Sequence, residues 1–207
     1  MKQQAWALAL TVGLLGAGGA SQATLSQAVD GMVYDDVLDL CWLQDVSASG
    51  PRAWDDANTW AETLDFGGHT DWRLARMSNT SPTASITICD GTNEAACRTS
   101  GNELGYMFFH NLGGSFPLLG DQGPFLNIPL AIWSGTEYLP TDDAWAFKAD
   151  TGNQDNRGSK AEEVPGWAVR DGQCSAAPPA QSVPTISVWG LGALSLLLMV
   201  LARARLR

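Results

Sequence analysis

Short apolar segments separated by turn residues predict β-strands in this chain. Residues 32–43 hold two such segments on either side of Asp35 and Asp36, a pattern typical of two strands joined by a turn. The apolar side chains of 40–43 are expected in the core. Three further strands are expected at 128–133, 145–147 and 167–170, and we expect the strands to pair in antiparallel fashion.

Apolar residues at helical spacing predict two helices. Over 54–64 they recur at intervals of three and four residues, which places them on one helical face. The stretch 102–112 carries a second stripe of this kind and ends at Gly113 and Gly114. Two helices, short antiparallel strands and long loops together predict a compact α+β domain.

The first 23 residues have the layout of a secretory signal peptide. Lys2 precedes an apolar run over 5–16, and Ser21-Gln22-Ala23 fits the small-x-small pattern before a cleavage point. The alternative is a membrane anchor, but the run is short for a bilayer core of about 30 Å. We therefore expect residues 1–23 to be removed and the protein to be exported.

The last part of the chain is predicted to be a linker, over 176–182, followed by a sorting and membrane-spanning tail, over 183–207. The linker is composed of Ala, Pro, Gln and Ser, and the tail combines an apolar run with three terminal arginines. An ordinary C-terminal helix is the alternative, although the run is apolar on every face. The motif residues of the tail are Val183, Pro184, Thr185, Trp189 and Gly190.

This tail resembles the IPTL-CTERM sorting signal of bacteria, with Val183 in place of the usual Ile and Ile186 in place of the usual Leu. The resemblance implies recognition by an exosortase-type processing protease of a Gram-negative bacterium. It also implies attachment to the membrane through the tail before processing. The expected location is the cell envelope or cell surface, with release after cleavage as a further possibility.

The region between the two ends, residues 24–175, has the size of one domain and is strongly acidic. It holds all 22 acidic residues of the chain and 8 of its 12 basic residues, so its net charge is about −14. A field of this sign repels nucleic acids and other polyanions at long range. DNA and RNA are therefore excluded as expected partners.

Four cysteines, Cys41, Cys89, Cys97 and Cys174, lie in this exported region, where disulfides are the default. Three pairings are possible. We favour Cys89–Cys97, which brackets a short polar loop, together with Cys41–Cys174, which joins the first and last strands. Zinc is the competing interpretation, but there is no Cys-x-x-Cys pair and the two histidines lie far apart.

Several motifs, taken in order, resemble the DUF1566 family, also called the Lcl C-terminal domain. They are Gly-Gly-His-Thr-Asp-Trp-Arg-Leu at 67–74, Trp-Ser-Gly-Thr-Glu-Tyr at 133–138 and Trp-Ala-Val-Arg at 167–170, with further matches at 40–43, 54–64, 103–109 and 144–147. Ala75 replaces the usual Pro, and 76–100 is longer and more polar than is typical. The resemblance implies a fold near C-type-lectin-like and formylglycine-generating-enzyme-like domains.

Two of these motifs supply candidate ligand-binding residues. An Arg beside a Trp and an Asp can hold a carboxylate or sulfate group, or stack on a sugar ring. The alternative is a purely structural role, with the Trp in the core and the charges paired internally. The candidates are Asp71, Trp72, Arg73, Trp133, Ser134 and Glu137.

Asp150 and Asp155 are weak candidates for a calcium site. The segment around them lacks the Gly and the Glu that an EF-hand loop requires, so a solvated hairpin loop is the favoured interpretation. No cofactor is expected.

The sequence predicts an exported, non-catalytic domain that binds a glycan or another extracellular polymer in an adhesion or matrix role. Two alternatives stay open. One is an oxidative enzyme like the formylglycine-generating enzymes, which needs a pair of reactive thiols. The other is a purely structural protein of the envelope or matrix. Ser134 has neither a Gly-x-Ser-x-Gly setting nor a well-placed histidine, which argues against a serine hydrolase.

Overall fold

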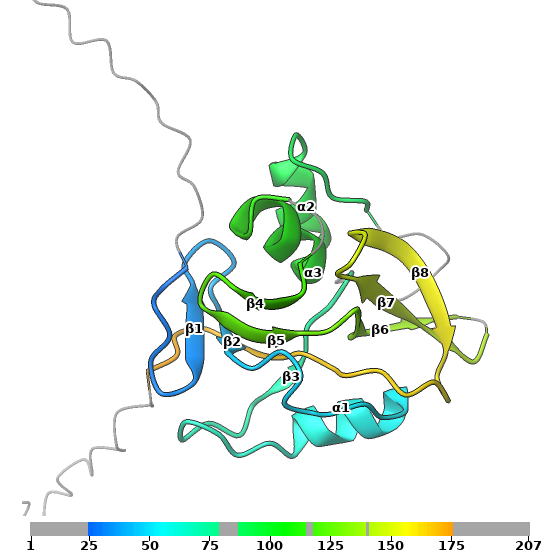
Figure 1. Ribbon diagram of the computed structural model, residues 1–207, viewed down its shortest axis with the longest axis horizontal. Coiled ribbons are helices and arrows are strands. Elements are labelled where there is room, and N and C mark those ends of the chain that lie inside the picture. Colours follow the sequence, from blue (N-terminus) through cyan, green and yellow to red (C-terminus); the bar gives the residue numbers. More distant parts are fainter. Residues whose placement is uncertain (1–24, 79–86, 115–117, 140, 176–207) are drawn as a thin grey trace, which may run out of the picture.

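A computed structural model describes residues 25–78, 87–114, 118–139 and 141–175 (Figure 1). The helical elements are α1 (Trp54–Glu62), α2 (Glu94–Ser100), α3 (Glu103–Tyr106) and the π-helical turn η1 (Met107–Asn111). The strands are β1 (Met32–Asp35), β2 (Leu40–Leu43), β3 (Arg73–Leu74), β4 (Gly120–Gln122), β5 (Phe125–Ile128), β6 (Ala131–Tyr138), β7 (Asp143–Lys148), β8 (Asn153–Ser159) and β9 (Ala168–Asp171). This mixture of helices with antiparallel sheets confirms the predicted α+β class.

The last strand of the domain lies inside the sheet that the first strands build. The strand order is β1-β2-β9-β3, and every neighbouring pair is antiparallel. The described chain consequently begins and ends on the same side of the domain, beside β1 (Figure 1). A disulfide between Cys41 in β2 and Cys174 just after β9 locks this closure.

A second sheet, β6-β7-β8, and the β4–β5 hairpin complete the β structure. The register of β6 shifts between Trp133 and Glu137, and within this irregular segment Gly135 donates its N–H to the carbonyl of Ala75 at 2.7 Å. The second sheet thereby meets the chain just after β3. Helix α1 packs against the same place, with Ala57 and Ala61 buried on Leu74 and Trp133.

Aromatic side chains form the centre of the larger core. Trp42 and Trp167 meet with ring centroids 4.6 Å apart, and Phe125 meets the edge of Trp167 at 4.8 Å. All three rings are buried. Burial of one indole contributes roughly 4–6 kcal/mol of transfer free energy, so this cluster is a principal source of stability.

The elements with a strong apolar pattern lie close to where the sequence predicts them. The 32–43 segment is the β1–β2 hairpin, and the first predicted helix begins at Trp54. The second covers α3 and η1, with a π-helical last turn. The segment at 128–133 is divided between β5 and β6, while 145–147 and 167–170 fall largely within β7 and β9.

Helix α2 and strands β3, β4 and β8 have no counterpart in the prediction. Helix α2 buries only Cys97, so it has no apolar stripe. Strand β3 has two residues, which is too short to form a pattern. The segment around Asp150, predicted as a solvated loop, is a short turn followed by β8 from Asn153 onward. Polar composition misled the prediction there, because this edge strand contains no apolar residue.

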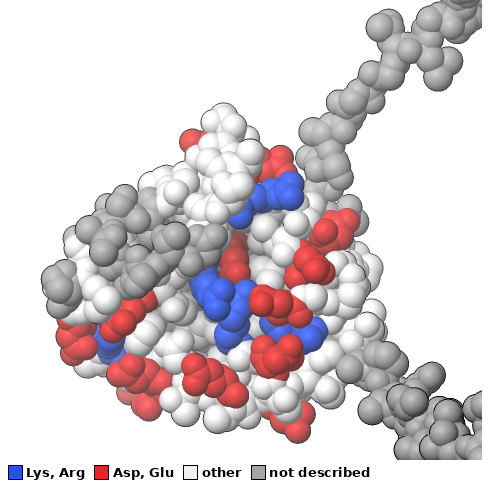
Figure 2. All heavy atoms as spheres, turned by 180° about the vertical axis from the view of Figure 1, so that it is seen from behind, with Lys and Arg blue, Asp and Glu red and all other residues white. Residues whose placement is uncertain are grey.

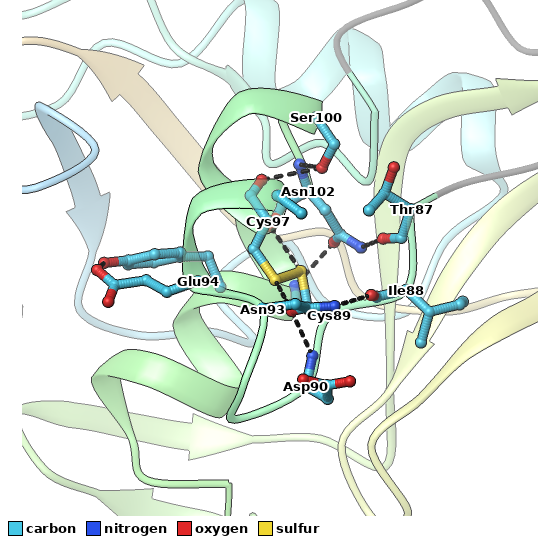
Figure 3. The surroundings of a disulfide bond; sticks show 12 residues. Thr87, Ile88, Cys89, Asp90, Asn93, Glu94, Cys97, Ser100 and Asn102 are labelled. Carbon is cyan, nitrogen blue, oxygen red and sulfur yellow. Dashed lines mark hydrogen bonds between the residues drawn. A yellow bond between two sulfur atoms is a disulfide. The ribbon is translucent and has the colours of Figure 1, made fainter.

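Both predicted disulfides are present, Cys41–Cys174 and Cys89–Cys97, and the zinc interpretation is wrong because all four cysteines are paired. The shorter bridge ties the 87–93 segment to α2 (Figure 3). Side-chain amides strengthen this tie. Gln154 accepts from the N–H of Cys89 at 2.8 Å and donates to its carbonyl at 2.9 Å, and Asn93 donates to the carbonyl of Ile88 at 2.7 Å.

A buried carboxylate closes the turn between β1 and β2. Asp35 accepts two backbone N–H groups, from Val37 and Leu38, each at 3.0 Å, and its other oxygen accepts from the Asn111 amide at 2.6 Å. Its side chain is inaccessible to solvent. Burial raises the pKa of Asp35 above the usual 3.8, although these hydrogen bonds act in the opposite direction.

No helix within the described ranges combines the length and the hydropathy needed to cross a bilayer. The predicted signal peptide, linker and tail all lie outside the described residues. These include the motif residues Val183, Pro184, Thr185, Trp189 and Gly190.

The two disulfides are expected to differ in their contribution to stability. Cys41–Cys174 spans 133 residues and Cys89–Cys97 spans 8. Loop-closure entropy then predicts that removing the first lowers the free energy of unfolding by about 5 kcal/mol and removing the second by about 2.5 kcal/mol. Urea unfolding of C41A/C174A and C89A/C97A measures both values. Equal losses, or a larger loss for the shorter bridge, would contradict the closure role of Cys41–Cys174.

Asp35→Asn is expected to remove one source of pH dependence. Because the pKa of Asp35 is raised in the folded state, the wild type loses stability as pH rises from about 3.8 through that raised value. The variant keeps the two backbone contacts, and a rotated Asn111 amide can accept from it. In urea titrations, the free energy of unfolding of the variant minus that of the wild type should therefore increase between pH 3 and neutrality. Parallel pH profiles would show that Asp35 is not responsible.

Candidate functional site

Arg73 forms a two-pronged ion pair with Glu103. Its Nη1 donates to Oε2 and its Nη2 donates to Oε1, both at 2.8 Å, which is the bidentate geometry of strong guanidinium–carboxylate pairs. The same Nη2 also donates to Asp171 at 2.7 Å. One guanidinium therefore connects β3, α3 and β9.

A second ion pair, with the charges reversed, joins β9 to Asp71, two residues before β3. Arg170 donates from Nε and Nη2 to the two oxygens of Asp71, at 2.7 and 3.0 Å. Its guanidinium holds the pKa of Asp71 below the usual range, mainly through the hydrogen bond. Asp71 and Arg73 are two residues apart, and Arg170 and Asp171 are adjacent in β9. Each of these two segments therefore supplies one arginine and one aspartate, and each arginine pairs with the aspartate of the other segment.

We refer to Asp71, Arg73, Glu103, Arg170 and Asp171 together as the ion-pair face, because the two ion pairs are linked through the adjacent β9 residues Arg170 and Asp171. Its arginines are covered and its aspartates are exposed. The side chains of Arg73 and Arg170 are 18 % and 12 % accessible, whereas those of Asp71 and Asp171 are 59 % and 78 % accessible. Solvent, or a ligand, consequently meets carboxylate oxygens that guanidinium groups hold in place from beneath.

Together with Arg76, the ion-pair face holds as many basic as acidic residues. Arg76 lies beside it, with its backbone N–H donating to Glu103 at 2.8 Å and its side chain exposed. Three of the eight basic residues of the domain thus accompany three acidic ones. Figure 2 shows a face on which Lys and Arg side chains gather near the middle and Asp and Glu side chains surround them.

The third residue of the predicted motif, Trp72, is a core residue. Its side chain is buried, its indole N–H points to the carbonyls of His69 at 3.1 Å and Phe66 at 3.3 Å, and its ring packs at the edge of Phe66. An indole in this position holds the loop before β3 and has no free face for a sugar ring.

Trp133 and Ser134 are also buried. The indole N–H of Trp133 donates to the carbonyl of Arg52 at 3.2 Å, and the hydroxyl of Ser134 donates to the carbonyl of Trp145 at 2.8 Å. Both side chains therefore secure the irregular part of β6 against its neighbours. A ligand at the surface does not reach them.

Glu137 belongs to a different cluster. It pairs with Lys160, whose Nζ lies 4.6 Å from the centroid of the Trp54 ring and 3.8 Å from Asp142. Glu137 raises the pKa of Lys160, chiefly by accepting its hydrogen bond. Among the described residues, no side-chain hydrogen bond or ion pair connects this cluster to the ion-pair face, so the six predicted residues do not form one site.

The weak calcium candidates are placed apart from both clusters. Asp150 lies in the turn after β7 and accepts from the hydroxyl of Thr151 at 3.3 Å, and Asp155 is a β8 residue whose side chain lies outside the described part. Within the described ranges, no three His, Cys, Asp or Glu side chains are grouped to hold a metal ion.

Sequence reasoning missed three members of the ion-pair face, namely Glu103, Arg170 and Asp171. Two of them, Glu103 and Arg170, lie inside segments that carry the family resemblance. Charges of opposite sign in separate motifs were a usable signal, because a charged side chain that the fold covers needs a partner of opposite sign.

The comparisons with known proteins identify one family. The family model described as the Lcl C-terminal domain matches residues 31–170. Neither the curated proteins nor the solved structures include a match to this chain. The matched range contains every residue of the ion-pair face except Asp171.

Glu103→Gln is expected to destabilise the domain through Arg73. The amide cannot form the bidentate ion pair, and Arg73 keeps only Asp171 as a carboxylate partner. The free energy of unfolding should therefore fall by about 1–3 kcal/mol. Glu62→Gln, at the exposed end of α1, makes the same chemical change and should cost less than about 0.5 kcal/mol. Urea unfolding of both variants measures these changes. Equal losses of unfolding free energy would show that the bidentate ion pair does not stabilise the fold.

Proposed function

The chain belongs to the Lcl C-terminal domain family, and from this premise we propose that it is a non-catalytic domain that binds a glycan or similar extracellular polymer through its ion-pair face. The role that fits is adhesion or matrix attachment outside the cell. The observation that carries the proposal is the pair of exposed carboxylates, Asp71 and Asp171, each fixed by a covered arginine.

Such carboxylates suit the hydroxyl groups of sugars. An ionised carboxylate accepts hydrogen bonds from hydroxyls, and hydrogen bonds to charged groups contribute about 1.5–3 kcal/mol each. Arg170 and Arg73 hold the two side chains in one arrangement before a ligand arrives. Less conformational entropy is then lost on binding.

The charge distribution favours a neutral polyhydroxylated ligand. The domain carries a net charge of about −14, which disfavours approach by sulfated chains. Both arginines of the face are already engaged with protein carboxylates, so they offer little to a polyanion. A glycan rich in free hydroxyls meets neither obstacle.

The state of the cysteines supports a binding role over thiol chemistry. All four are in disulfides, and Cys89 and Cys97 are buried. An oxidative enzyme of the formylglycine-generating type needs reactive thiols in a cleft, and this pairing leaves none. Disulfides also agree with export by the predicted signal peptide and with surface display through the predicted tail.

We also place the fold near C-type-lectin-like and formylglycine-generating-enzyme-like domains. The supporting feature is the closure of the domain by its terminal strands, in which β9 inserts between β2 and β3. This relation agrees with a surface-binding role and assigns no ligand by itself.

A glycan array tests the proposed function, with the exported protein assayed in the presence and absence of calcium. The wild type should bind at least one neutral glycan. Asp71→Asn/Asp171→Asn should weaken that binding by about tenfold or more, because both charged acceptors are lost. Asp55→Asn/Asp56→Asn, which changes the same charge on exposed positions of α1, should bind like the wild type.

Two results would contradict the proposal. One is the absence of any glycan signal under both conditions. The other is equal affinity for the two double variants, which would move the binding site away from the ion-pair face. A circular-dichroism melt of each variant confirms that the comparison is made between folded proteins.

A further inference from the structure

The ion-pair face already contains a cation at its centre. The Arg73 guanidinium lies between the carboxylates of Glu103 and Asp171, with three N···O contacts of 2.7–2.8 Å. A further contact from Nη1 reaches the carbonyl of Leu74 at 3.2 Å. Two carboxylates and a carbonyl around one positive group resemble the oxygen surroundings that calcium takes in proteins, but here the guanidinium occupies them.

Every carboxylate of the face has a guanidinium beside it, which leaves lone pairs for neutral hydroxyl donors but puts a positive charge next to each possible metal ligand. Oε2 of Glu103 accepts from both Arg73 and the N–H of Arg76, and both oxygens of Asp71 accept from Arg170. Calcium needs six to eight oxygen ligands. It would have to displace a guanidinium or sit beside one, where like charges repel.

The position of Arg73 is set by the fold. Its backbone pairs with Val169 in β9, and its side chain is mostly covered. It therefore holds Asp171 in place from below and has little surface to offer a ligand. This makes Arg73 a positioning residue for the ion-pair face.

From this geometry we propose that Arg73 serves as the built-in cation of the ion-pair face, so that the face takes its neutral polyhydroxylated ligand without a divalent metal. The inference rests on the proposed function for the identity of the ligand. The exclusion of calcium from the face stands on the arginine contacts alone and is testable without any glycan.

The first experiment titrates calcium chloride into the full exported protein by calorimetry. The proposal predicts that any saturable calcium binding is the same in the wild type and in Asp171→Asn. Saturable binding that Asp171→Asn abolishes, and that Asp55→Asn/Asp56→Asn leaves intact, would place calcium on the face and overturn the proposal. This outcome is decided whether or not a glycan is known.

The second experiment measures the affinity for a glycan identified on the array, in calcium and in EDTA. The dissociation constants should agree within about twofold, whereas a metal-bridged ligand would lose tenfold or more in EDTA. A large loss of affinity in EDTA would refute metal-independent binding, while glycan binding itself would be established. The absence of glycan binding in both buffers refutes the proposed function, and the calcium titration still decides the inference.

Arg73→Lys tests the positioning role. Lysine keeps the positive charge but lacks the planar guanidinium whose several N–H groups hold Glu103 and Asp171. The folded variant should bind the glycan about tenfold more weakly, with the same indifference to calcium and EDTA. Wild-type affinity in this variant would contradict the positioning role, and a gain of calcium dependence would show that charge alone does not keep the metal out.

Discussion

The ion pair between Arg73 and Glu103, extended to Asp171, is the interaction on which the surface depends. It joins a strand of two residues, a helix of one turn and the last strand of the domain. None of these elements is long enough to persist alone. The β3–β9 ladder, the Cys41–Cys174 bridge and the buried indoles hold the backbones together, and the guanidinium then fixes how the polar side chains face the solvent.

The family signature in this chain mainly builds the framework. Trp72, Trp133 and Ser134 are buried and bonded to backbone carbonyls, and Arg73 is mostly covered. The groups that meet the solvent are the aspartates beside them.

The sequence allowed some of this to be predicted and concealed the rest for physical reasons. Regular apolar spacing located the β1–β2 hairpin and α1, and the cysteine spacing indicated the two bridges. Asp71 and Arg73 were candidates, but their partners lie 99 and 30 residues away, and no local pattern encodes such contacts. Trp133 and Ser134 were misleading as ligand candidates, because an aromatic next to a hydroxyl serves equally well to anchor an irregular strand.

The central claim is that a carbohydrate meets Asp71 and Asp171 on a face organised by Arg73. The most direct test is a nuclear magnetic resonance titration of the labelled protein with a neutral glycan that it binds, following the arginine Nε–Hε, lysine Nζ–H and side-chain carboxyl signals. The account predicts that Asp71, Asp171, Arg73 and Arg170 shift together with saturation, while Lys160 and Glu137 do not. Shifts confined to the Lys160–Glu137 cluster would contradict it.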